Sequence, residues 1–240
     1  MMRFLFTLVW GSLLLVPAHG QSTSRDSTGL TRSALAVALA RHDQVSTTPE
    51  HLYDGPEYIS YDRRLTGHAY YPNDTMQQGQ ITYKGTRFDV PMLYDIVKDV
   101  LIVVHYSGYR LALHSDQVQT FTYTGHTFIR LDSAAQGMPS GFYDVLYNGP
   151  TQLLARYKKE VLVNPTSFGY GIFNPKTTYY LRKNGQYVQI RTKRAILALL
   201  EDRRKQLATY SRQQKLKFRP SPVAAFLKLA QQYDALTNSL

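Results

Sequence analysis

One strand–turn–strand pattern stands out in this chain, at residues 118–131, whose sequence is VQTFTYTGHTFIRL. Val118–Tyr123 and Thr127–Leu131 alternate polar residues with the aromatic and β-branched residues that favour strands. Gly125 and His126 interrupt the alternation and mark a turn. The pattern predicts an antiparallel hairpin.

Four further hairpins are predicted around it, closed by Gly-containing dipeptides typical of tight turns. Their strand pairs are Ile81–Tyr83 with Thr86–Val90, Leu101–Tyr106 with Tyr109–Leu113, Phe142–Tyr147 with Gln152–Tyr157, and Tyr179–Arg182 with Gln186–Ile190. The second pair flanks a two-residue loop, Ser107-Gly108. Short strands at this spacing are typical of an antiparallel meander, a curled sheet or a partial barrel. The predicted fold class is therefore α+β, mainly β.

After Ile190 the apolar residues take up the spacing of a helix. One helical face would carry Ile196, Leu199, Leu200, Leu207 and Tyr210. Pro220 and Pro222 separate this helix from a second one at residues 224–236. The β-meander should thus be followed by two C-terminal amphipathic helices.

The first twenty residues have the composition of an export signal. Arg3 provides the positive start, Leu5–Val16 is the apolar stretch, and Ala18-His19-Gly20 is a cleavage site of small residues. The apolar stretch is too short to span a membrane, and no later apolar run approaches the ~18 residues of a membrane helix. The predicted organisation is a signal peptide at 1–20, a polar leader with a short helix (31–41) at 21–50, a β-rich domain at 51–190, and a basic helical tail at 191–240, packed on or beside that domain.

The chain has 240 residues and no cysteine. Disulfides, thiolate catalysis, and zinc or iron–sulfur sites held by cysteine are therefore excluded. Because small secreted eukaryotic domains usually carry disulfides, an exported chain without cysteine fits a bacterial envelope better. We expect an exported protein that is periplasmic or secreted, or peripheral to the outer membrane.

The positive charge of the chain is concentrated in one segment. The net charge of +11 becomes +10 when Arg3 leaves with the signal peptide. Residues 182–219 alone hold twelve Lys or Arg and two acids, Glu201 and Asp202, which also gives +10. The rest of the mature chain is therefore neutral.

Such a segment either contacts a polyanion or forms a solvated face that keeps the protein soluble. Because exported proteins rarely meet nucleic acid, the expected polyanion is an anionic envelope lipid or glycan, and the other option is a partner protein. The candidate ligand-binding residues for an anionic surface are Lys193, Arg194, Arg203, Arg204, Lys205, Arg212 and Lys215.

Catalytic motifs are less specific. Glycoside hydrolysis needs two carboxylates roughly 5–10 Å apart. The available acids are Asp54, Glu57, Asp62, Asp95, Asp99 and Asp144. Asp95 and Asp99 are four residues apart, and we expect them to face one way. The favoured interpretation of these acids is that they face solvent and balance nearby Arg and Lys.

No metal or cofactor is predicted. The histidines lack metal-ligand spacing, although His105, His114 and His126 could meet across adjacent strands. Glycine-rich nucleotide loops are absent, which excludes nucleotide binding by those loops.

Tyrosine is abundant, with 19 residues, and Tyr-Asp dipeptides recur at 53–54, 61–62, 94–95, 143–144 and 233–234. One interpretation is a glycan-binding surface on which tyrosine rings stack on sugars. The other is strand residues that meet Asx-Gly turns. The sequence leaves open whether the Tyr-rich strands form a core or a binding face.

Three stretches carry a resemblance: LYDGPEYISYD at Leu52–Asp62, GHTFIRL with GFYDVLYNG within Gly125–Gly149, and KRAILALLEDRRKQLATYSRQQKLKF at Lys193–Phe218. In these, the chain resembles a group of exported proteins of Gram-negative envelopes that have a β-rich body and a basic helical tail. The resemblance implies location and architecture. The group has no assigned activity, so it implies no catalytic residue.

The favoured hypothesis is an exported, non-enzymatic envelope module whose basic helix contacts an anionic surface. One alternative is a metal-independent hydrolase that acts on envelope glycan. Another is an integral outer-membrane β-barrel, since alternating aromatic strands permit one.

Overall fold

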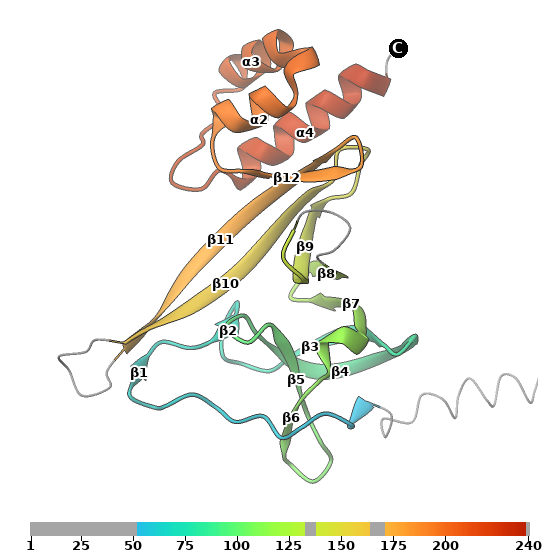
Figure 1. Ribbon diagram of the computed structural model, residues 1–240, viewed down its shortest axis with the longest axis vertical. Coiled ribbons are helices and arrows are strands. Elements are labelled where there is room, and N and C mark those ends of the chain that lie inside the picture. The colour runs from blue at the N-terminus through green and yellow to red at the C-terminus, as the bar shows by residue number, and fades with distance from the viewer. Residues whose placement is uncertain (1–51, 133–137, 164–170, 239–240) are drawn as a thin grey trace, which may run out of the picture. The chain divides into compact units, whose positions relative to one another are not determined.

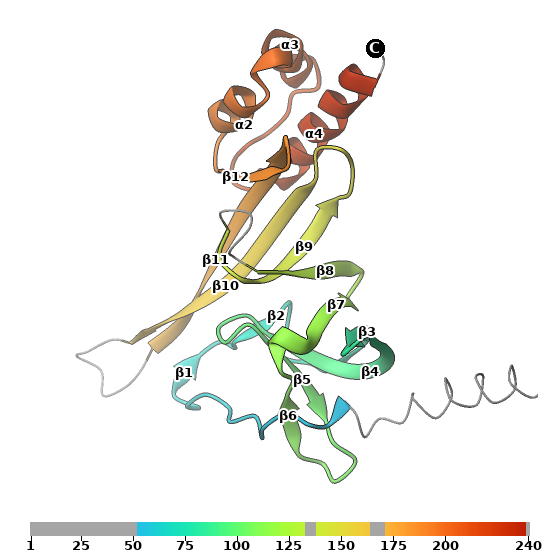
Figure 2. The same cartoon turned by 45° about the vertical axis from the view of Figure 1, so that its right-hand side comes forward.

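The computed structural model describes residues 52–132, 138–163 and 171–238. All of them belong to the second of the two units into which the chain divides, Val45–Leu240. The predicted signal peptide, leader and short helix lie outside the described residues. Figures 1 and 2 show a sheet of strands followed by three helices, which gather at the end where β12 lies.

The described residues form an open sheet of twelve strands, which confirms the mainly-β class. The strand order is β1-β11-β10-β9-β8-β7-β3-β4-β5-β6, with β12 on β11 and β2 on β4. The pairing of β1 with β11 is parallel, and the other pairs are antiparallel. The strands are β1 Leu65–Thr66, β2 Tyr70–Tyr71, β3 Gln77–Tyr83, β4 Thr86–Asp95, β5 Val100–Val104, β6 Arg110–Ala112, β7 Val118–Tyr123, β8 His126–Leu131, β9 Gly141–Tyr147, β10 Leu153–Val163, β11 Gly171–Lys183 and β12 Gln186–Ile190.

All five predicted hairpins are present. In the β7–β8 hairpin the turn is Thr124-Gly125, one residue before the predicted position, and both residues have positive φ. This is the geometry that matches the twist of two paired strands. The β5–β6 connection is five residues long rather than two, because the chain turns at His105, whose carbonyl accepts from the Gly108 amide at 2.8 Å.

β10 and β11 also pair with each other, in a long hairpin that was not predicted. The two strands pair over eleven residues, from Leu153 with Leu181 to Val163 with Gly171. The predicted strands ended at Tyr157 and began at Tyr179, because the residues beyond them include Lys158–Glu160 and Pro175, residue types that are depleted in strands.

The predicted C-terminal helices follow the sheet, and the described residues contain three of them rather than two, because the first is broken. The helices are α2 Lys193–Leu199, α3 Arg204–Gln213 and α4 Val223–Asn238, and a 3₁₀ turn, Glu201–Arg203, separates α2 from α3. At the break, Lys183 of β11 donates to the Leu199 carbonyl at 2.9 Å and pairs with Asp202 at 2.5 Å. The sheet thus supplies a donor for the end of α2, which no helical periodicity could predict.

Two large apolar clusters hold the fold together. In the sheet, Phe121 and Phe128 stack at 4.6 Å, and Tyr94 and Phe142 meet them edge to face. The second cluster lies between the helices and the ends of β10, β11 and β12. Four tyrosines of the strands lie fully in the interior, since Tyr83, Tyr94, Tyr123 and Tyr143 are at most 1% exposed. Within the described residues, none of the helices has the length and apolarity needed to cross a bilayer.

Candidate functional site

The three helices and the turns between them form a cap (residues 193–238) that is anchored to the sheet by apolar packing. The anchoring residues are Leu153, Leu181 and Ile190 from the strands and Ile196, Leu197, Leu200, Leu207, Phe226, Leu229 and Ala230 from the helices. Each of them is at most 7% exposed. The cap is therefore held by its uncharged face, and its outer face is left for other contacts.

A buried carboxylate fastens α4 to the sheet. Asp234 is 3% exposed and accepts hydrogen bonds from the Tyr147 hydroxyl at 2.9 Å and the Thr151 amide at 3.1 Å. The Thr151 hydroxyl donates to it as well. The Tyr233-Asp234 dipeptide is thus a structural joint.

Asp202, one of the two acids of residues 182–219, forms its contacts within the protein. Asp202 pairs with Lys183 and accepts from the Tyr233 hydroxyl at 3.0 Å. These hydrogen bonds and the Lys183 charge hold the pKa of Asp202 below its usual value, against the effect of burial. Among the described residues, Lys183 is the one member of the twelve cations that forms an ion pair.

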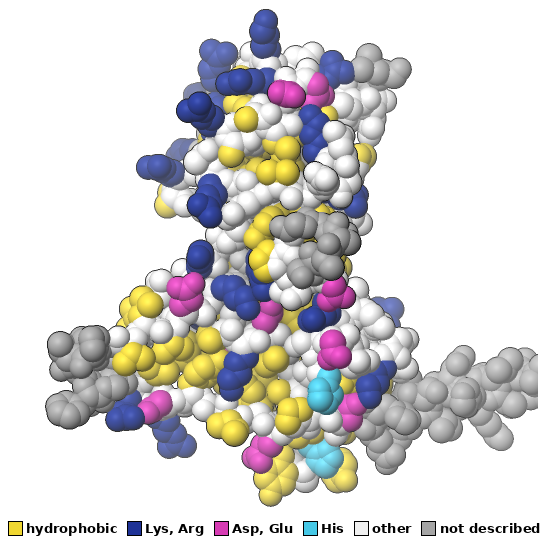
Figure 3. Space-filling view, viewed as in Figure 1, with side chains coloured by type: hydrophobic (Ala, Val, Ile, Leu, Met, Phe, Trp, Pro, Cys, Tyr) yellow, Lys and Arg dark blue, Asp and Glu magenta, His cyan; other side chains and the backbone are white. Residues whose placement is uncertain are grey.

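The seven predicted ligand-binding residues all lie on the cap or on the turn after α3. Five of them are exposed: Arg194, Arg204, Lys205, Arg212 and Lys215. The other two are half-buried: Lys193, whose ammonium lies 5.6 Å from the Phe218 ring centre, and Arg203, whose Nε has no hydrogen-bond partner among the described residues. Figure 3 shows Lys and Arg side chains gathered over the cap with few acids among them, whereas the sheet carries both signs.

Four of these cations occupy unfavourable positions in their helices. Lys193 and Arg194 begin α2, and Arg204 and Lys205 begin α3, while neither first turn contains an acid. Because the amino end of a helix carries partial positive charge, a cation there costs about 0.3–1 kcal/mol. Helix stability therefore does not explain why these residues are cations.

The six candidate carboxylates are not gathered in one place. Asp62 is held by Arg64, which lowers its pKa to about 2. Asp54 contacts Tyr83 and Lys84. Glu57 lines a groove of about 330 Å³ between residues 53–57 and the β5–β6 hairpin. None of the other five acids lines this groove.

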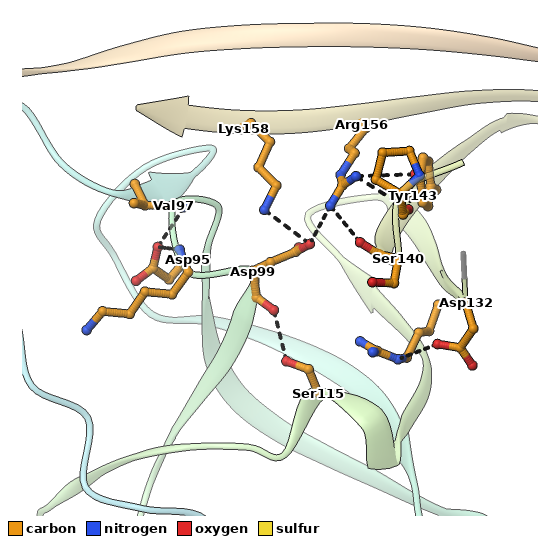
Figure 4. A network of polar contacts seen from close by, with 12 residues as sticks. Asp95, Val97, Asp99, Ser115, Asp132, Ser140, Tyr143, Arg156 and Lys158 are labelled. Atoms are coloured by element: carbon orange, nitrogen blue, oxygen red, sulfur yellow. Dashed lines mark hydrogen bonds and ion pairs between the residues drawn. The ribbon is translucent and has the colours of Figure 1, made fainter. Parts of the chain in front are cut away.

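Asp95 and Asp99 engage separate partners, contrary to the expectation that they face one way (Figure 4). Asp95 ends β4 and accepts from the Val97 amide at 2.8 Å, whereas Asp99 contacts Arg156 and Lys158 of β10 at 3.2 and 3.3 Å. The turn between the two acids, in which Asp99 has a φ of 62°, breaks the strand register. Asp99 thus joins β10 to the β4–β5 turn.

The three histidines that could have met across strands are also apart. His105 contacts Ser107 in the β5–β6 connection, and His114 lies against the backbone of Asp54. His126 lies 2.7 Å from Asp144. Groups of three or more potential metal-binding side chains are absent from the described parts of the chain.

The contact between His126 and Asp144 was not predicted, because the two residues lie on neighbouring strands, eighteen positions apart. Asp144 is 1% exposed and also accepts from the Tyr157 hydroxyl at 2.8 Å. Burial raises the pKa of Asp144, and its hydrogen bonds partly oppose that shift. The Tyr71 ring stacks on Tyr157 at 4.4 Å and closes the cluster from the β2 side.

Lys183 is the residue whose structural role sequence patterns missed most clearly. It belongs to the charged segment but orders the α2–α3 break rather than facing solvent. The predicted strand ended one residue before it, at Arg182, and nothing in the sequence indicated a helix end beside it.

Comparison with protein-family models, curated proteins and solved structures finds no match to this chain.

Proposed function

We propose that this protein is an exported, non-enzymatic binding module that presents its basic cap to an anionic surface of the cell envelope. The observation that carries the proposal is that most cations of the basic segment have no ion-pair partner among the described residues and that most of the candidate residues are exposed. Of the twelve cations of residues 182–219, Lys183 is ion-paired within the described residues, and five of the seven candidates are exposed.

The anchoring of the cap supports this function. Apolar packing and the Asp234 joint fix the helices without using the exposed cations. The cations are therefore displayed on a scaffold that does not depend on them. A Lys or Arg close to an anionic membrane contributes about 1 kcal/mol of binding free energy, so three of them suffice for a change of more than a hundredfold.

The test is sedimentation with phosphatidylglycerol-containing vesicles at low and high salt, with phosphatidylcholine vesicles as the uncharged reference. A cap variant would carry Arg194→Gln, Arg204→Gln and Lys205→Gln. A matched variant with the same loss of charge would carry Arg63→Gln, Arg87→Gln and Arg110→Gln, three exposed residues outside the cap.

We expect the native protein to bind the anionic vesicles at low salt and to be released by salt, because exposed charges are screened within about 10 Å at 0.1 M. The cap variant should lose roughly a hundredfold in affinity, and the matched variant much less. Equal losses in both variants would show that net charge alone governs binding. Binding that ignores salt would contradict the proposal.

A further inference from the structure

One edge of β11 is left without a strand partner between two paired ends. β10 covers the opposite edge along eleven residues. On the remaining edge, β12 pairs with residues 179–183 and β1 with residues 171–172. Phe173 is contacted by Tyr61, with ring centres 5.2 Å apart. Within the described chain, residues 174–178 have no strand beside them on that edge.

The register shows which backbone groups point to this free edge. Lys183 and Gln186 flank a two-residue turn, so they form a hydrogen-bonded pair, as do the alternate residues Leu181 and Tyr179. The same alternation continues along β11, so the next such residue, Thr177, directs both its N–H and its C=O to the free edge. The intervening residues bond to the other side, as the amide of Arg182 does when it donates to the Gln152 carbonyl at 2.9 Å.

Pro175 fits the same pattern. At this position the N–H of any other residue would point to the free edge. A proline, which has no N–H, therefore removes no hydrogen bond to β10. A proline within a sheet is confined to such edge positions. The free edge therefore offers the N–H of Thr177 and the carbonyls of Thr177 and Pro175.

The edge opens into a groove of about 590 Å³, which continues the line of β12 beyond its last residue. The groove is lined by Lys176–Tyr179 of β11, Gln189–Arg191 at the end of β12, and Pro220–Pro222 before α4. Among the described residues, Lys176 and Arg191 are the charged residues that line it, and none of the lining residues is an acid. Glu160 lies 3.9 Å from Lys176 with both side chains well exposed, a contact of negligible strength.

We propose that this edge binds an extended acidic peptide segment of a partner protein, which adds a strand to β11 next to β12. Strand addition uses main-chain hydrogen bonds for affinity and side-chain pockets for selectivity. The cations at the groove select an acidic segment. They also oppose pairing with the same edge of a second copy, because two sets of Lys176 and Arg191 would then face each other. None of the seven candidate cations of the anionic-surface site lines this groove, and its ligand is recognised by backbone as well as by charge.

The test uses an array of labelled hexapeptides in which Glu alternates with Val, Thr, Ile, Tyr or Phe. The decisive variant is Thr177→Pro, which removes the edge N–H without removing a bond to β10. Thr177→Val is its matched control, because it keeps the N–H and loses only the hydroxyl. We expect the best peptides to lose at least tenfold in affinity for Thr177→Pro and to bind Thr177→Val normally.

A second measurement does not depend on the variant's folding. The best peptides, methylated on alternate backbone nitrogens, should lose at least tenfold in affinity for the native protein although their charge is unchanged. The cap variant, with Arg194→Gln, Arg204→Gln and Lys205→Gln, should bind the peptides normally, which separates this site from the vesicle-binding function. Equal binding of methylated peptides, the absence of binding by every peptide, or a dimer that Thr177→Pro dissociates would each overturn the proposal.

Discussion

Replacing Arg204 with Gln should stabilise the protein while it weakens binding to an anionic surface. Arg204 is the first residue of α3, where a positive charge opposes the helix dipole. Arg and Gln have nearly equal helix propensity, so the exchange changes mainly the charge. Removing the charge should raise the free energy of unfolding by about 0.3–1 kcal/mol. For a chain of this size that corresponds to an increase of about 1–4 °C in Tm.

Arg212 provides the matched control within the same helix. It lies in the last turn of α3, where a cation is favourable, and its Nε lies 3.4 Å from the Ala208 carbonyl. Arg212→Gln should therefore lower the free energy of unfolding by a similar amount. Both exchanges remove one exposed cation from the cap, so each should reduce vesicle affinity about fivefold, or about 1 kcal/mol.

The two variants are compared by scanning calorimetry and by binding to phosphatidylglycerol-containing vesicles in the same low-salt buffer. Opposite shifts in Tm with equal losses in affinity are the expected result. Shifts of the same sign would refute the argument that the first-turn cations oppose folding. Unchanged affinity in both variants would refute a binding role for α3.

Three further variants probe the anchoring of the cap and the buried acids. Asp234→Ala leaves three donors from Tyr147 and Thr151 without an acceptor and should cost about 3 kcal/mol in urea unfolding, more than Asp234→Asn. Phe226→Ala empties a fully buried site beneath the helices and should cost about 3–5 kcal/mol, measured the same way. Asp144 has a raised pKa in the folded state, so its contribution to stability is present at low pH and is lost as pH rises through that pKa. The free energy of unfolding of the native protein relative to Asp144→Asn should therefore fall between pH 4 and pH 7, and a rise over that range would show that the His126 contact dominates.

The hairpins could be predicted because each depends on residues close together in the sequence. β7 has its predicted bounds, and β8 begins one residue early, since the alternation around Thr124-Gly125 carries both strand and turn information. The outer half of β10–β11 could not be predicted, because Pro175 and the Lys158–Glu160 run have poor strand propensity. Eleven paired residues outweigh that local preference.

The basic segment could be located from the sequence, but its internal division could not. Ile196, Leu200 and Leu207 are all buried, as one helical face would require. The break between them depends on Lys183, which reaches the Leu199 carbonyl from β11, sixteen residues away in the chain. A contact between a strand and a helix end leaves no periodic pattern, and the same holds for His126 with Asp144.

The charge of the cap should not change across the physiological pH range, and neither should its binding to a permanently anionic lipid. Residues 182–219 contain no histidine, the residue type that ordinarily titrates between about pH 5 and 8. The Lys183 contact keeps the pKa of Asp202 below its usual value, so this carboxylate stays ionised over the same range and keeps the α2–α3 break ordered. Vesicle affinity at constant ionic strength should therefore vary less than twofold from pH 5.5 to 8. A tenfold change would place the binding surface outside residues 182–219 and would remove the cap from the proposed function.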